Sequence, residues 1–153
     1  MTHHIIKRVQ AAAVFDHIVL AVPDLPSEKP LEELADQLNI SFFSGPEDDV
    51  LARFIGAAES VGANQLLRVC GDNPLIDIPL MKDLLTEHLN ARSDYTVVKD
   101  PIPLGTGTEM VSLKSLMTIW ETTQDPRYLE HVTSYFQDHG DSFTLQQISA
   151  PFY

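Results

Sequence analysis

The feature that most constrains the fold of this sequence is the regular alternation of short β-like runs with helical stripes. Residues 15–22 form a largely apolar run suited to a strand that is covered on both faces. Apolar residues then recur at the spacing of one helix face, at Leu31, Leu34, Ala35 and Leu38. Because consecutive parallel strands need a helical crossover, this alternation predicts an α/β fold with a mainly parallel sheet and helices on both faces.

Further segments continue the alternation along the chain. Strands are expected at residues 40–43, 66–70, 95–98 and 144–148, with 109–112 as a possible further short strand. Helices are expected over residues 47–61, 81–89, 113–120 and 129–136. Cys70 is expected to be buried in its strand and Trp120 to lie in the core, because each continues an apolar pattern. The length of 153 residues fits one domain, so residues 1–153 are predicted to form a single domain.

Composition narrows the classes of partner. The chain carries 10 Lys and Arg against 22 Asp and Glu, a net charge of -12, which argues against a nucleic-acid partner because phosphates are held by basic residues. Its apolar runs are far shorter than the roughly 20 residues of a membrane span, so no membrane partner is expected. The single cysteine, Cys70, forms no intrachain disulfide. A cytoplasmic location is therefore the default expectation.

The loop after the strand at 66–70 is the first candidate for a binding site. In open α/β sheets, ligands bind beyond the carboxyl ends of the strands. Here the strand runs into Gly71, Asp72, Asn73 and Pro74. A glycine permits close approach of a ligand to the backbone, and an aspartate can present a carboxylate oxygen to Mg²⁺. The same four residues also make a good turn, so this motif alone is a weak signal.

Three stretches in the right order strengthen this interpretation. Residues 43–54 read FSGPEDDVLARF, residues 68–77 read RVCGDNPLID, and Asp125-Pro126 is followed by EHVT at 130–133. Together they resemble the cytidylyltransferase family, which includes synthetases that activate sialic acid and 3-deoxy-manno-octulosonic acid as CMP sugars. The likeness is greatest to the branch named for spore coat polysaccharide biosynthesis protein F. It implies a Rossmann-like nucleotide-diphosphosugar transferase fold, and transfer of CMP from CTP to a sugar or sugar acid with the help of Mg²⁺.

The resemblance also implies roles for individual residues. Asp72 matches the family's metal-binding aspartate. Gly107 matches the position at which many relatives carry a second metal-binding aspartate, and Glu109, which would share a strand face with residue 107, is the candidate substitute. The residues implied as substrate contacts are Arg53, Arg68, Gly71, Asn73 and His131. No residue is assigned to a catalytic step.

Alternatives remain open for three of these residues. Arg53 and Arg68 are equally well explained as surface ion-pair partners of the acidic run at residues 47–49. His131 is more simply explained by packing or hydrogen bonding at the far side of the sheet than by contact with a sugar.

The resemblance has one large gap, at the start of the chain. Relatives begin with a strand and a basic, glycine-containing loop around the CTP phosphates, whereas this sequence opens on a helix-like segment at residues 1–8. We therefore expect a truncated domain that lacks the first strand and the main triphosphate cradle. The chain would then be either a shortened cytidylyltransferase or a non-catalytic module for assembly or regulation. Loss of a strand would expose apolar edges at residues 15–22 and 66–70, and these edges favour a homodimer.

Overall fold

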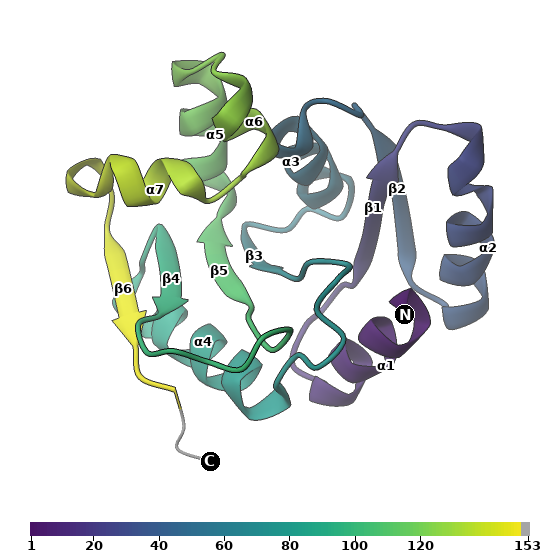
Figure 1. The fold of residues 1–153 in the computed structure, drawn as a ribbon, viewed down its shortest axis with the longest axis horizontal. Coiled ribbons are helices and arrows are strands. Elements are labelled where there is room, and N and C mark those ends of the chain that lie inside the picture. The colour runs from purple at the N-terminus through teal and green to yellow at the C-terminus, as the bar shows by residue number, and fades with distance from the viewer. Residues whose placement is uncertain (151–153) are drawn as a thin grey trace. The chain divides into compact units, whose positions relative to one another are not determined.

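A computed structural model describes residues 1–150, which form two compact units (Figure 1). The first unit contains Met1–Phe15, Gln65–Ser112 and the segment from Asp141 onward. The second contains Asp16–Asn64 and Leu113–Gly140. Each unit is thus built from segments that lie far apart in the sequence. The expectation of a single domain over residues 1–153 stays a prediction, and residues 151–153 lie outside the described part of the chain.

The first unit is a four-stranded sheet with two helices. Its helices are α1 (Thr2–Ala12) and α4 (Ile78–Ala91), and its strands are β3 (Gln65–Arg68), β4 (Tyr95–Val98), β5 (Glu109–Ser112) and β6 (Leu145–Ile148). The strand order is β3-β5-β4-β6. Strands β4 and β6 are parallel, but β5 runs antiparallel to both of its neighbours. The connection explains why β5 is antiparallel to β4. These two strands are joined by an irregular loop without a helix, and neighbouring parallel strands would need a crossover connection.

Helix α4 holds the core of the first unit together. Its N-terminus is capped by Asp77, whose Oδ1 accepts a hydrogen bond from the Leu80 N–H at 2.7 Å. It ends at Ala91 and is followed by Arg92, which adopts the left-handed conformation with φ of 53°. Its buried residues contribute to two apolar clusters, one with α1 and one with the sheet. The first cluster contains Ile5, Ala12, Ile76 and Met81, and the second contains Leu80, Leu84, Met110 and Ile148.

The second unit pairs two parallel strands, β1 (Val19–Pro23) and β2 (Ser41–Gly45), through the crossover helix α2 (Lys29–Leu38). A short 3-10 turn, Pro26–Glu28, leads into α2. The remaining helices of this unit are α3 (Val50–Ser60), α5 (Leu113–Thr122), α6 (Pro126–Glu130) and α7 (Ser134–Asp138). The Asp49 carboxylate caps α3 and also accepts the indole N–H of Trp120 on α5, at 2.9 Å. One side chain therefore joins two helices.

The predicted α/β architecture is confirmed, with corrections at particular elements. The strand predicted at 66–70 ends at Arg68, so Cys70 lies beyond it and is half-buried. The helix predicted over 129–136 is two short helices, α6 and α7, interrupted at residues 131–133. Trp120 is not in the core, because 42% of its surface is exposed and its indole bonds to Asp49. Among residues 1–150, no helix combines the length and the apolar character that crossing a membrane requires.

Candidate functional site

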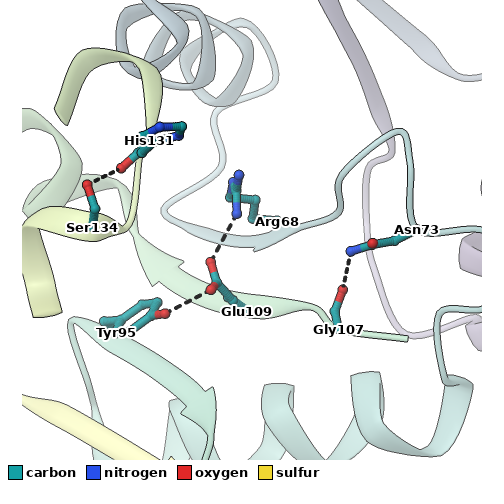
Figure 2. A network of polar contacts seen from close by, with 7 residues as sticks. All are labelled: Arg68, Asn73, Tyr95, Gly107, Glu109, His131 and Ser134. Carbon is teal, nitrogen blue, oxygen red and sulfur yellow. Dashed lines mark hydrogen bonds and ion pairs between the residues drawn. The ribbon is translucent and has the colours of Figure 1, made fainter. Parts of the chain in front are cut away.

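The loop that follows β3, residues 69–77, is tied down by backbone and side-chain hydrogen bonds within the first unit. The Asn73 amide nitrogen donates to the Gly107 carbonyl at 2.9 Å, as Figure 2 shows. The Leu75 N–H donates to the Gly105 carbonyl at 3.0 Å. On the other side, Arg8 Nε of α1 donates to the Ile76 carbonyl at 2.8 Å. These bonds give the loop a fixed path between α1 and the connection from β4 to β5.

Gly71 and Asp72 are exposed in this loop, as is Leu75 further along it. A Cβ atom added at Gly71 would meet nothing within 4 Å, so the backbone there is open to a ligand. Asn73 is half-buried, and its amide is used to hold the connection at Gly107. Asn73 therefore stabilises the loop, while Gly71 and Asp72 are accessible to a ligand. Their roles in substrate and metal binding stay predictions.

Three polar side chains meet beside this loop, one from each of the strands β3, β5 and β4 (Figure 2). Arg68 is paired directly with Glu109 across β3 and β5, and its Nη1 lies 3.2 Å from Glu109 Oε2. The Tyr95 hydroxyl donates to the other carboxylate oxygen, Glu109 Oε1, at 2.9 Å. Tyr95 is 3% exposed. Each oxygen of Glu109 thus accepts from a different neighbour.

Much of the donor capacity of Arg68 is unused. A guanidinium has five N–H donors, and the contact to Glu109 uses Nη1. Its Nε atom is buried without a hydrogen-bond partner among the described residues. Leaving a buried donor unsatisfied costs about 1–3 kcal/mol, which is a reason to expect a ligand at that position. A guanidinium fixed on one side can offer its free donors to a phosphate or a carboxylate.

The predicted metal pair, Asp72 and Glu109, does not form a complete binding site in this part of the chain. Within residues 1–150, no group of three or more His, Cys, Asp and Glu side chains is placed to hold a metal ion. Both oxygens of Glu109 already accept hydrogen bonds from Tyr95 and Arg68. The arrangement therefore does not fit Glu109 as a metal ligand, while Asp72 is exposed and accessible.

Cys70 adds information on the electrostatics of the site. Burial raises the pKa of its thiol, the charge of Arg68 opposes this rise, and Asp72 and Glu109 add to it. The thiol of Cys70 is therefore influenced by charged side chains from β3, from β5 and from the loop. With a raised pKa, the group is a neutral thiol at neutral pH and not a thiolate nucleophile.

Arg53 and His131 belong to the second unit. Arg53 Nη1 donates to the carbonyls of Pro46 and Glu47, at 2.5 and 3.3 Å, so it stabilises the turn before α3. Of the two arginines that could alternatively pair with the carboxylates of residues 47–49, Arg53 binds backbone carbonyls of that run instead, and Arg68 pairs with Glu109 within its own unit. His131 is exposed at the end of α6, and its carbonyl accepts from the Ser134 hydroxyl at 2.8 Å (Figure 2).

Sequence patterns missed two contributors to the site. Tyr95 reads as an ordinary apolar strand residue, and its partner Glu109 lies 14 positions away. Arg8 lies in the opening helix, 68 positions from the carbonyl to which it donates. Both contacts depend on strand register and helix packing, for which a single sequence carries no local signal.

Solved structures show to which class this fold belongs. A cytidylyltransferase from Leptospira borgpetersenii is similar, with a TM-score of 0.91 and 20% identity over 97% of this chain and 64% of that one. A CMP:2-keto-3-deoxy-manno-octonic acid synthetase complexed with CTP is also similar, with a TM-score of 0.71 and 12% identity over 97% of this chain and 79% of that one. At such identities the likeness establishes the fold, which is the Rossmann-like α/β fold of nucleotidyltransferases.

Sequence comparison then gives the family. The sequence model described as cytidylyltransferase matches residues 1–153, so the chain belongs to the cytidylyltransferase family. It is 31% identical over 152 residues to the spore coat polysaccharide biosynthesis protein SpsF of Bacillus subtilis, covering 96% of this chain and 63% of that protein. An uncharacterized protein of Methanocaldococcus jannaschii is 28% identical over 97% of this chain and 61% of its own length. The chain thus spans somewhat less than two thirds of either relative.

Proposed function

We propose that this chain takes part in the transfer of CMP from CTP to a sugar or sugar acid, for the synthesis of a surface polysaccharide. The observation that carries the proposal is the match of the cytidylyltransferase family over the whole chain. The name of the Bacillus subtilis relative supports a polysaccharide product. A similar solved structure is a synthetase for a CMP-activated sugar acid, bound to CTP, which supports the nucleotide and the class of acceptor.

The first unit supplies the groups that this reaction would use. Arg68 offers free N–H donors for a phosphate or a sugar carboxylate, and the backbone at Gly71, in the loop that follows β3, is open to a ligand. Asn73 holds the loop that carries Gly71 and Asp72 in place. A divalent ion such as Mg²⁺, when bound, would neutralise the charge that builds as pyrophosphate leaves, and the exposed Asp72 is the residue we propose to hold it. Arg53 and His131 of the second unit remain proposed substrate contacts.

We also propose that the protein acts as a homodimer in the cytoplasm. In the described residues, β1 pairs with β2 alone and β3 pairs with β5 alone, so each has one edge without a strand neighbour. A strand edge of this kind favours contact with a second copy. The single cysteine is compatible with a reducing compartment. A dimer predicts a sedimenting species of twice 17.1 kDa at micromolar concentration, and a species of 17.1 kDa would contradict it.

Pyrophosphate release tests the proposed function. Purified protein is incubated with Mg²⁺, one nucleoside triphosphate and one sugar acid, and pyrophosphate is followed by a coupled assay. We expect release with CTP and not with ATP, and only when the sugar acid is present. An Arg127→Met variant serves as a control, because Arg127 is an exposed arginine whose partner is Asp138 of the second unit. Release that does not depend on the sugar acid, or no release at all, would contradict the proposal.

A further inference from the structure

We propose that Glu109 and Tyr95 act together to position Arg68 for binding a substrate oxyanion, and that Glu109 is not a metal ligand. The inference rests on the proposed function, because the oxyanion is either a phosphate of CTP or the carboxylate of a sugar acid. Glu109 and Tyr95 are positioning residues here, since neither has to touch the substrate. Arg68 is the group that would bind it.

Strand register places the three side chains on one face of the sheet. Arg68 is opposite Glu109 across β3 and β5, and Tyr95 is opposite Val111 across β4 and β5. Directly opposed residues of antiparallel strands point to the same face. Residues 109 and 111 of β5 also share a face, because side chains alternate along a strand. The contact between Tyr95 and Glu109 is therefore a diagonal one across neighbouring strands, fixed by the backbone of the sheet.

The two hydrogen bonds of Glu109 determine its orientation. Tyr95 is 3% exposed, so its ring is held by packing, and its hydroxyl fixes one carboxylate oxygen at 2.9 Å. The other oxygen then faces Arg68 Nη1 at 3.2 Å. The Arg68 and Glu109 side chains are 23% and 21% exposed, so water screens this ion pair less than it would a surface pair. The guanidinium is thus held on one side before any ligand arrives.

The remaining donors of Arg68 point to the class of ligand. Its Nε is buried and has no partner among the described residues. Nε and one Nη form the edge of a guanidinium that matches two oxygens of a phosphate or a carboxylate. An oxyanion with two free oxygens would satisfy this edge while Glu109 keeps its own contact. Binding would then complete the hydrogen bonding of a side chain that the protein alone leaves incomplete.

The same contacts argue against a metal ion on Glu109. A divalent ion bound to either oxygen would displace a hydrogen bond from Tyr95 or Arg68. It would also lie close to the positive guanidinium, at a cost that falls only inversely with distance. Asp72 has neither constraint, because it is exposed on the loop. Any metal ion of this unit should therefore depend on Asp72 and not on Glu109.

Three hypotheses for Glu109 predict different responses to Glu109→Gln. If Glu109 positions Arg68, this variant weakens oxyanion binding and leaves Mn²⁺ binding unchanged. If Glu109 is a metal ligand, the variant weakens Mn²⁺ binding. If Glu109 only neutralises Arg68, removal of its charge strengthens oxyanion binding. Tyr95→Phe separates the hypotheses further, because it removes one hydrogen bond to Glu109 and no charge.

The test is calorimetric titration of the full chain with CTP and with 3-deoxy-manno-octulosonic acid, together with Mn²⁺ titration followed by electron paramagnetic resonance. We expect Arg68→Met to weaken one of the two organic ligands by about tenfold or more, which identifies the source of the oxyanion. Glu109→Gln and Tyr95→Phe should weaken the same ligand about threefold to tenfold. Tyr95→Phe should have no further effect in the Arg68→Met background. Loss of Mn²⁺ affinity in Glu109→Gln, or tighter binding of either oxyanion, would overturn the proposal.

A second measurement keeps the proposal separate from the proposed function. The Arg68 Nε–H signal in a ¹⁵N correlation spectrum should exchange slowly with water in the natural protein and faster in Tyr95→Phe, with Arg127→Met as the control. If neither oxyanion binds the natural protein, the proposed function fails and so does the binding role of Arg68. The exchange rates still decide the positioning role: equal rates in the natural protein and Tyr95→Phe would refute it.

Discussion

His88 should make the stability of the first unit depend on pH. Its side chain is buried on the inner face of α4, with 1% of its surface exposed. One ring nitrogen lies 2.8 Å from the Thr96 hydroxyl and the other 2.7 Å from the Gln65 side-chain oxygen. Burial lowers the pKa of His88, and the negative charge of Asp94 opposes part of that effect. The ring is therefore expected to be neutral, with its N–H directed at Gln65 and its free nitrogen accepting from Thr96.

The direction of the pH dependence follows from this lowered pKa. In the unfolded chain the histidine has its ordinary pKa of about 6.5, so below that pH the unfolded state binds a proton that the folded state does not. The contribution of His88 is complete above about pH 6.5 and is lost as the pH falls through and below that value. A difference of one proton gives a slope of about 1.4 kcal/mol per pH unit in the free energy of unfolding.

Urea unfolding at pH 7.5, 6.5 and 5.5 measures this slope. His88→Gln should be less stable than the natural protein at pH 7.5, because it disturbs two buried hydrogen bonds, yet its stability should fall less steeply below pH 6.5. His17→Gln is the control, because His17 is exposed, and its slope should equal that of the natural protein. Equal slopes in His88→Gln and the natural protein would refute the assignment of a neutral, buried histidine.

Three further predictions concern other residues. Asp49→Ala should lower the free energy of unfolding by about 1–2 kcal/mol and change the fluorescence of Trp120, since Asp49 caps α3 and binds the indole; Asp48→Ala, its exposed neighbour, should do neither. Asp72→Asn should abolish Mn²⁺ binding with a stability change below about 0.5 kcal/mol, and Mn²⁺ binding equal to that of Asp83→Asn would contradict the metal role. Alkylation of Cys70 by iodoacetamide should reach half of its maximal rate at a pH above the ordinary pKa of a thiol, about 8.5, and a midpoint below that value would show that burial does not raise its pKa.

The spacing of apolar residues predicts the helices and strands of this fold well where a segment follows either the helical or the strand spacing throughout. Strands β4 and β5 lie at the predicted residues, 95–98 and 109–112. Helix α3 begins at Val50, three residues after the predicted start at 47, because Asp49 is its cap. The interruption between α6 and α7 was not predictable, because apolar spacing continues through Val132, which is buried outside either helix.

The contacts of the site were harder to predict than its residues. The sequence marks Arg68, Asp72 and Glu109 as candidates, but periodicity tells only which side chains share a face of one strand. The contact of Glu109 with Tyr95 and Arg68 requires that β5 lie between β3 and β4 in antiparallel register. That pairing is a property of the whole sheet. For the same reason, the bonds of Asn73 and Leu75 to the connection from β4 to β5 became visible only in the structure.

The most direct test of the proposed function is the identity of the reaction product. Protein, Mg²⁺, CTP and 3-deoxy-manno-octulosonic acid are incubated, and the mixture is followed by ³¹P NMR. Transfer of CMP predicts equal amounts of pyrophosphate and of a phosphodiester signal from the CMP sugar, as the three signals of CTP disappear. Unchanged CTP, or its conversion to CDP and inorganic phosphate without a phosphodiester, would contradict the assignment of CMP transfer to this protein.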